Sequence, residues 1–126
     1  MDLKIAKGRA CGVVQAPPSK SMAHRMLLCA GLAEGESVVH NVAFSEDILA
    51  TIDVLRALGA TCRIDGDTVT VTGADARQAH YDGVLSCRES GSTLRFCIPL
   101  LLLSGNEFTL TGKGRLLQRP QDVYVD

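Results

Sequence analysis

The sequence lacks the excess of positive charge that is typical of proteins held on nucleic acid by bulk electrostatics. Its 13 lysines and arginines face 14 aspartates and glutamates, so the formal net charge at pH 7 is −1. A chain so close to neutrality attracts polyanions weakly, and we expect no nucleic-acid partner. Any site for an anion must therefore be built locally, from a few cations that the fold brings together.

The sequence also lacks the cysteine and histidine patterns of disulfide-rich and zinc-binding proteins. The five cysteines are odd in number, no two have Cys-x-x-Cys spacing, and the three histidines share no metal-ligand spacing. Disulfide frameworks need paired cysteines and zinc sites need clustered ligands, so we expect neither a disulfide framework nor a metal site. We expect reduced, buried thiols in a cytoplasmic protein at Cys11, Cys29, Cys62, Cys87 and Cys97.

Apolar runs long enough to cross a bilayer, which takes about 20 residues, are missing as well. The run "FCIPLLLL" at 96–103 predicts instead a helix buried on all sides. The N-terminus, "MDLKIAKGRA", has no apolar core of the kind found in a signal peptide. With 46% hydrophobic and 21% charged residues, the composition is that of a globular protein with no membrane partner.

Hydrophobic spacing predicts an α/β order of elements. Two strands are expected within residues 3–16, and Pro17 and Pro18 end them. A strand is expected at 37–42 after a helix that runs from Ser21 to Gly35. Apolar residues recur at helical spacing along that helix, at Met22, Met26, Cys29, Ala30 and Ala33.

A second helix is expected to begin at Ser45, a residue type that caps helix N-termini, and to end at Gly59. Its apolar stripe consists of Ile48, Ile52, Leu55 and Leu58. A hairpin follows at 61–72 with Asp65-Gly66 at its turn. After it we expect a strand at 83–87, a helix at 91–105, a strand at 107–111, and a further helix whose first turn would hold Pro120.

This order of elements repeats along the chain. Arg25 and Arg95 are 70 positions apart (95 − 25), and so are Gly35 and Gly105 (105 − 35). Each unit is predicted to read β-α-β-α-β-β, with residues 17–73 forming the first unit and residues 74–126 an incomplete second one. Residues 1–16 are the separate N-terminal strands. Repeated units pack alike, so we expect their helix N-termini to face the same side.

Cations lie at three of the predicted helix starts, where the helix dipole disfavours them. Helix N-termini have unpaired N–H groups that bind anions, and ammonium and guanidinium groups add charge-assisted hydrogen bonds. One motif alone is explained as well by capping serines and solvated cations, but three together favour one shared site for a ligand with several negative groups. The residues are Ser19, Lys20, Ser21 and Arg25 at the first start, Gly91, Ser92, Thr93 and Arg95 at the second, and Arg119 at the third.

Four motifs follow one another along the chain: "PPSKSMAHRMLLCAGLAEG", "SEDILATIDVLRALGA", "ESGSTLRF" and "RLLQRP". Together they resemble the N-terminal part of the 5-enolpyruvylshikimate-3-phosphate synthase family. The related UDP-N-acetylglucosamine enolpyruvyl transferases usually have Lys-Asn where this chain has Lys20-Ser21. The resemblance therefore favours the shikimate enzyme.

The resemblance implies transfer of the enolpyruvyl group from phosphoenolpyruvate to shikimate 3-phosphate in aromatic amino acid (chorismate) biosynthesis, without a cofactor. It implies that Lys20 is catalytic, that Lys20, Ser21 and Arg25 bind shikimate 3-phosphate, and that Lys20, Gly91 and Arg119 bind phosphoenolpyruvate. Supporting roles are implied for Arg95, Ser92, Glu89 and Glu46. The sequence departs from the family pattern at Pro18, usually Gly, and at His24 and Glu89, both commonly Asn. A Glu89 carboxylate without a cationic partner would weaken anion binding.

The resemblance also implies a longer chain with two domains, each built from β-α-β-α-β-β units of the enolpyruvyl transferase fold. We therefore expect this chain to be a fragment, inactive alone, whose residues 1–16 associate with a missing domain. Two alternatives stay open. One is an enzyme like the UDP-N-acetylglucosamine enolpyruvyl transferases, and the other is a non-catalytic binding or structural module of the same repeat.

Overall fold

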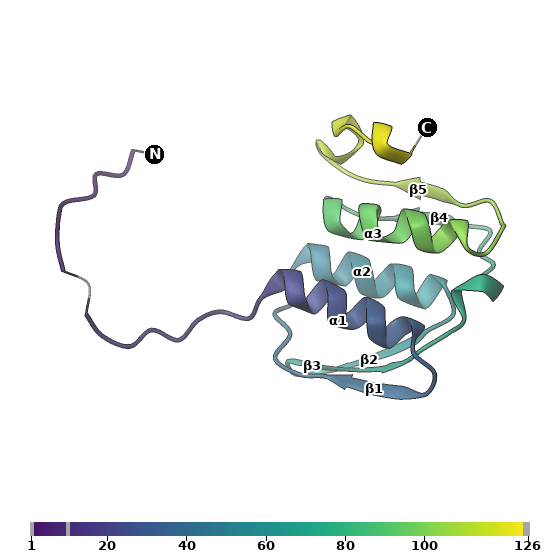
Figure 1. Cartoon of the computed structure of the whole chain (residues 1–126), viewed down its shortest axis with the longest axis horizontal. Helices are drawn as coiled ribbons and strands as arrows, with labels where there is room; N and C mark the ends of the chain where they lie inside the picture. Colours follow the sequence, from purple (N-terminus) through teal and green to yellow (C-terminus); the bar gives the residue numbers. More distant parts are fainter. Residues whose placement is uncertain (1, 10, 125–126) are drawn as a thin grey trace.

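The structure is a computed structural model that describes residues 2–9 and 11–124. Three helices lie side by side in one layer; a three-stranded sheet packs against α1 and α2, and a strand pair lies beside α3 (Figure 1). The helices are α1 (Lys20–Leu32), α2 (Glu46–Ala57) and α3 (Gly91–Leu102). The strands are β1 (Glu36–Val39), β2 (Thr61–Asp65), β3 (Thr68–Thr72), β4 (Val84–Ser86) and β5 (Thr109–Thr111), with short 3-10 turns at Ala76–Gln78, Leu116–Gln118 and Asp122–Tyr124.

The three-stranded sheet has the order β1-β3-β2, and both of its pairings are antiparallel. In the β2–β3 hairpin Asp65 lies opposite Thr68, so the loop consists of Gly66 and Asp67. Gly66 has φ +58, a conformation that glycine adopts without steric cost. The turn therefore falls one position later than the predicted Asp65-Gly66.

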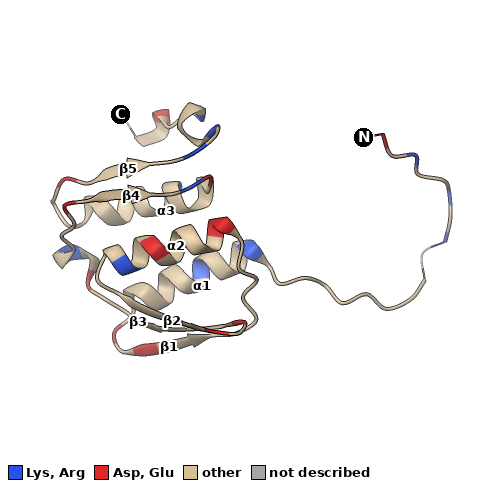
Figure 2. Cartoon of the chain, turned by 180° about the vertical axis from the view of Figure 1, so that it is seen from behind, with Lys and Arg blue, Asp and Glu red and all other residues tan. Residues whose placement is uncertain are grey.

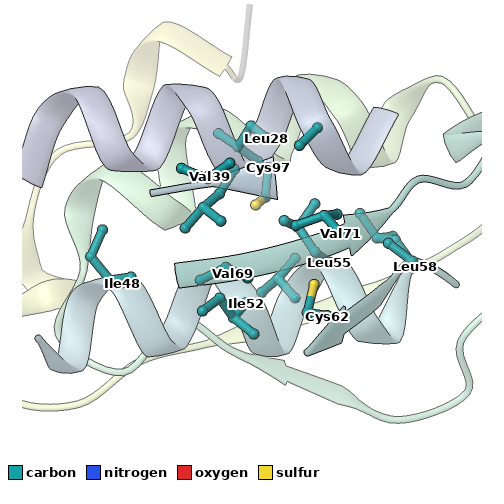
Figure 3. Close-up of a cluster of buried hydrophobic side chains, with 14 of the residues drawn as sticks. Leu28, Val39, Ile48, Ile52, Leu55, Leu58, Cys62, Val69, Val71 and Cys97 are labelled. Atoms are coloured by element: carbon teal, nitrogen blue, oxygen red, sulfur yellow. The ribbon is translucent and has the colours of Figure 1, made fainter. Parts of the chain in front are cut away.

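Helix α2 is the centre of the main hydrophobic core. Ser45 accepts a hydrogen bond from the Ile48 backbone N–H at 3.4 Å and caps the helix, as predicted. All four residues of the predicted stripe are buried and pack with Val69 and Val71 of β3 (Figure 3). Burial of each large aliphatic side chain contributes about 1.5–3 kcal/mol, so this interface holds the helix layer to the sheet.

Helix α1 forms as predicted but buries a different face. Met22, Met26 and Cys29 are exposed, and the buried side chains include Leu27 and Leu28. Apolar residues lie on two faces of this helix, so spacing alone does not choose between them. The choice follows from packing, because Gly31 lies directly against the Leu55 side chain and lets α1 approach α2 closely.

Helix α3 connects two parallel strands, β4 and β5, so the predicted strand-helix-strand order is confirmed here. The prediction of a helix buried on all sides is wrong, because Pro99, Leu102 and Leu103 are exposed. Leu94, Cys97 and Leu101 are buried instead, so only one side of α3 faces the core. Pro99 has no N–H to donate to the Arg95 carbonyl, and the Tyr124 hydroxyl donates to that oxygen at 3.2 Å.

The segment before α1 contains no strand in residues 2–9 and 11–19, so the prediction of two N-terminal strands is wrong for this structure. The segment extends away from the helices (Figure 1), and Leu3, Ile5, Val13 and Val14 are between 78% and 102% exposed. A strand needs a neighbour for its backbone hydrogen bonds. The alternating pattern indicates an extended segment, but nothing in the described part of the chain pairs with it.

Candidate functional site

The N-terminal ends of α1 and α3 and the first turn of α2 surround one hollow of about 680 Å³. This is the arrangement expected from the repeat, since helix starts from both predicted units face it. Cationic and acidic residues gather at this end of the three helices (Figure 2). Of the predicted site residues, the hollow is lined by Lys20, Glu89, Gly91, Ser92, Arg95 and Arg119.

At the start of α1, the Lys20 ammonium reaches across to α2. Its Nζ lies 2.6 Å from Oδ2 of Asp47, and the side chains are 54% and 26% exposed. Ser19, not Ser21, caps the helix by accepting from the Met22 backbone N–H at 3.3 Å. Lys20 is therefore held over the hollow by a carboxylate that sequence analysis did not identify.

Ser21 and Arg25 do not line this hollow. The Arg25 guanidinium donates to the Ser21 backbone carbonyl at 2.8 Å and lies 5.3 Å from the centre of the Phe96 ring, within cation–π range. Phe96 itself is part of the wall of the hollow. Arg25 thus contacts a residue of the wall without lining the hollow itself.

At the start of α3, the backbone and Arg119 come into close contact. Ser90 caps the helix by accepting from the Thr93 backbone N–H at 3.1 Å. A Cβ atom at Gly91 would lie only 2.6 Å from Nη1 of Arg119, so glycine allows the guanidinium to rest on the helix start. Arg95 donates to the Pro120 carbonyl at 3.3 Å and joins the same segment to α3.

Arg119 is positioned by the 3-10 turn that precedes it. Leu116 in that turn is 1% exposed, and its carbonyl accepts from the Arg119 backbone N–H at 3.1 Å. The segment after Pro120 forms a 3-10 turn at Asp122–Tyr124 where a further helix was expected. A buried leucine thus fixes the backbone from which the third cation extends.

A buried chain of polar side chains links the three helices, and sequence analysis missed it. Nδ1 of His24 lies 2.8 Å from Oγ1 of Thr51, which lies 2.8 Å from Oγ1 of Thr93. Thr93 donates to Oγ of Ser90 at 2.7 Å. All four side chains are at most 1% exposed, so the network ties α1, α2 and the α3 cap together. The only sequence signal was a threonine, Thr51, at a buried position of the α2 pattern.

His24 is the titratable member of this network. Burial lowers the pKa of its imidazole below 6.5; Asp47 raises it, and Lys20 and Arg25 lower it further. Nε2 of His24 is buried and has no hydrogen-bond partner within the part of the chain that is described. A protonated ring would leave its Nε2–H unsatisfied, which agrees with a neutral His24 in the folded state.

Glu46 and Glu89 have different surroundings. Glu46, on the first turn of α2, accepts from Nη1 of Arg88 at 2.7 Å and does not line the hollow. Glu89 lines the hollow, and among residues 2–9 and 11–124 it belongs to no ion pair. Arg88, which binds Glu46, was not identified from the sequence.

Neither a metal-binding cluster nor a membrane-spanning helix occurs among residues 2–9 and 11–124. No group of three or more His, Cys, Asp and Glu side chains among them is arranged to hold a metal ion. None of the described helices combines the length and the apolar character needed to cross a membrane. Cys11 and Cys29 are exposed and Cys62, Cys87 and Cys97 are buried, so the prediction of buried thiols is wrong for the first two.

Helix N-termini, a lysine and two arginines thus surround one hollow of an α/β protein. The chain belongs to the EPSP synthase (3-phosphoshikimate 1-carboxyvinyltransferase) family, which matches residues 5–126. The resemblance inferred from the motifs is thus confirmed.

Relatives and solved structures of this family cover most of the chain. It is 42% identical over 122 residues to a 3-phosphoshikimate 1-carboxyvinyltransferase of Clostridium perfringens (97% of this chain, 29% of the relative) and 45% identical over 115 residues to one of Clostridium kluyveri (91% and 27%). An EPSP synthase structure from Acinetobacter baumannii matches 88% of this chain and 25% of its own, with TM-score 0.80 and 26% identity. The α/β fold is therefore that of the family, and the chain spans less than a third of the length of these relatives.

Proposed function

We propose that this chain provides part of the substrate site of an enzyme that transfers the enolpyruvyl group from phosphoenolpyruvate to shikimate 3-phosphate, a step of aromatic amino acid (chorismate) biosynthesis. The observation that supports it most strongly is the gathering of Lys20, Arg95 and Arg119, from three separate segments, around one hollow. Both substrates carry several negative groups, which cations and helix N–H groups bind.

The assignment of residues to substrates rests on the family resemblance together with their positions. Lys20, Gly91 and Arg119, which meet in the hollow, are assigned to phosphoenolpyruvate, with Ser92 and Arg95 in support. Ser21 and Arg25, at its edge, are assigned with Lys20 to shikimate 3-phosphate. Because Arg25 contacts Phe96 of the wall and does not itself line the hollow, the second substrate would reach from the hollow toward α1.

The reaction needs more than anion binding. The attacking hydroxyl oxygen of shikimate 3-phosphate bonds to C2 of phosphoenolpyruvate and loses its proton, while the methylene carbon, C3, gains one and becomes a methyl group. Phosphate then leaves C2 as the C3 methyl group loses a proton, which restores the double bond. Acid and base groups must lie within reach of both substrates. Asp47 is paired with Lys20, so we assign the acid and base groups to a part of the enzyme outside this chain. Lys20 would bind the anions and orient them, with catalysis following from that placement.

The same proposal places the enzyme in the cytoplasm. Three thiols are buried and none of the five cysteines is in a disulfide within the described residues, which fits a reducing compartment.

Titrations of the ¹⁵N-labelled 126-residue chain with each substrate test this function. We expect shikimate 3-phosphate and phosphoenolpyruvate to shift the backbone amides of Lys20, Gly91 and Ser92, with weak and salt-sensitive affinity, and UDP-N-acetylglucosamine to leave them unchanged. Shifts caused by the UDP-sugar alone would instead favour the related transferase. An absence of shifts with all three compounds would favour a structural module. A phosphate-release assay with both substrates should detect no turnover by this chain alone.

A further inference from the structure

One turn beside the hollow adopts a conformation that its sequence disfavours. The Ser90 backbone N–H donates to the Cys87 carbonyl at 2.9 Å, which closes a turn over Arg88 and Glu89. Arg88, the first central residue, has φ +49. Glycine is the residue favoured at a first central position with positive φ, so an arginine there indicates that its side chain has a function that outweighs the strain.

The Arg88 side chain fastens this turn to α2. Its Nη1 lies 2.7 Å from Oε2 of Glu46, and its Nη2 lies 2.7 Å from Oδ2 of Asp53. The two carboxylates are seven positions apart on one helix, and therefore about two turns apart on the same face. A planar guanidinium with several donors is suited to bridge them, and the Arg88 side chain is only 28% exposed.

The backbone of Arg88 fastens the turn to a second segment. Its carbonyl accepts from the Lys113 backbone N–H at 2.6 Å, and a Cβ atom at Gly112 would lie 3.0 Å from that oxygen. Lys113 begins the segment that leads through the Leu116–Gln118 turn to Arg119. One residue is thus bonded to α2 and to the segment that presents Arg119, immediately before Glu89, Gly91 and Ser92 of the hollow.

We propose that Arg88 is a positioning residue of the anion site: held by Glu46 and Asp53, it fixes the β4–α3 turn so that Gly91 and Arg119 keep their places around the hollow. This role rests on the proposed function. It assigns to Glu46 the task of holding Arg88 and makes Asp53 an equal partner in it. Neither carboxylate needs to touch a substrate for this purpose.

The first measurement needs no ligand. Hydrogen exchange of the Ser90 and Lys113 backbone amides is measured in the parent 126-residue chain and in two variants, Arg88→Ala and Arg88→Gly. We expect exchange of both amides to be at least about tenfold faster in Arg88→Ala, with a smaller effect in Arg88→Gly because glycine relieves the strained φ. The Val69 and Val71 amides of β3 should keep their protection and report the intact core. Unchanged exchange at Ser90 and Lys113 in Arg88→Ala would overturn the proposal that Arg88 fixes this turn.

The second measurement is the affinity for inorganic phosphate, followed at the Gly91 and Ser92 amides. The decisive variant is Asp53→Asn, which removes a negative charge. If the net charge near the hollow alone determined the affinity, this variant would bind phosphate more tightly. The positioning role of Arg88 predicts the opposite, an affinity lowered by about three- to tenfold, and no further loss when Asp53→Asn is added to Arg88→Ala. Arg77→Ala is the matched control for Arg88→Ala. It also removes an arginine that is paired with an aspartate, Asp75, at 2.8 Å, but Arg77 does not line the hollow.

The two measurements separate the possible failures. Tighter or unchanged phosphate binding in Asp53→Asn would overturn the positioning role while leaving the proposed function in place. A parent chain that binds no phosphate, shikimate 3-phosphate or phosphoenolpyruvate would overturn the proposed function and the role that rests on it, and the exchange data would still decide whether Arg88 fixes the turn.

Discussion

Lys20 and Asp47 join the first turns of α1 and α2 through an ion pair of 2.6 Å. The helix dipole favours the carboxylate at its position and disfavours the ammonium at its own, so Asp47 offsets the cost of placing a cation at a helix start. The pair also means that the lysine assigned to both substrates already has an anionic partner. A phosphate that reaches Lys20 must compete with Asp47.

Asp47→Asn is therefore expected to tighten the binding of inorganic phosphate to this chain. The gain should be about 0.2–1 kcal/mol, the range of a partly exposed ion pair, and it should shrink as salt is added. Phosphate titration of the labelled chain measures it. Asp65→Asn is the control, since it changes the charge equally at an exposed position of the β2 strand. Equal effects of the two variants would mean that Asp47 does not compete for Lys20.

Gly91→Ala is expected to weaken phosphoenolpyruvate binding more than shikimate 3-phosphate binding. The new methyl group would lie 2.6 Å from Nη1 of Arg119, so the guanidinium must move off the start of α3. We expect a loss of about 1–3 kcal/mol in phosphoenolpyruvate affinity, the scale of a charged hydrogen bond. Because Arg119 is exposed and its far end is flexible, thermal stability should change little. Paired titrations with the two substrates check this, and equal losses for both would contradict the assignment of Gly91.

The elements that the sequence predicted best are those whose signals are local. Ser45 and the four apolar residues of the predicted stripe lie in α2 or at its two caps, and their pattern alone predicted its start and its buried face. Helix α1 offered two apolar faces, and the close contact of Gly31 with Leu55, a non-local event, decided between them. The N-terminal strands failed for the same reason, since a strand depends on a partner that its own pattern does not identify.

The candidate site likewise contains residues that local sequence signals predicted and contacts that only the packed fold shows. The 70-residue repeat and the cations at helix starts predicted that Lys20, Gly91 and Arg95 meet. No pattern predicted the bonds of Arg88 to Glu46 and Asp53, residues 42 and 35 positions away. The polar chain from His24 to Thr93 was equally hidden, because a threonine in an apolar stripe reveals nothing about its partner until the helices are packed.

The cysteines should divide into two reactive and three protected thiols. Burial raises the pKa of Cys62, raises that of Cys87 to about 11 and raises that of Cys97 to about 12, the last with a contribution from Cys87. Since the thiolate is the reactive form, a pKa of about 11 instead of 9.0 lowers its fraction at pH 8 by about 100-fold. Cys11 and Cys29 are exposed.

A thiol-specific disulfide reagent at pH 8 measures this division. Two equivalents should react quickly in the folded chain, and all five after unfolding in guanidinium chloride. Mass spectrometry of the partly labelled chain should find the label on Cys11 and Cys29. Early labelling of Cys87 or Cys97 would show that the α3 region opens on the timescale of the reaction.

The neutral state of His24 should make folding depend on pH. Its pKa is lowered in the folded chain below 6.5, chiefly by burial, so the unfolded chain binds a proton at a higher pH than the folded one does. As the pH falls below about 6.5, the unfolded state is favoured. The free energy of unfolding should therefore fall, by at most about 1.4 kcal/mol per pH unit for one group, until the pH reaches the lowered pKa. Above pH 6.5 this contribution is fully present.

Urea unfolding of the parent chain and of His24→Asn between pH 7.5 and 5 isolates this contribution, since the other groups that titrate are common to both. The asparagine has a donor and an acceptor toward Thr51 but no proton to gain, so the difference in free energy of unfolding between the two chains should narrow as the pH falls. His40→Asn is the control, because His40 is exposed and contacts Thr68 at 3.2 Å outside the network. The three charges around the imidazole, Asp47, Lys20 and Arg25, stay the same in every chain. A difference that is constant with pH would mean that His24 is protonated equally in both states, and the His24–Thr51–Thr93 chain would then be a packing feature without a role in the pH response.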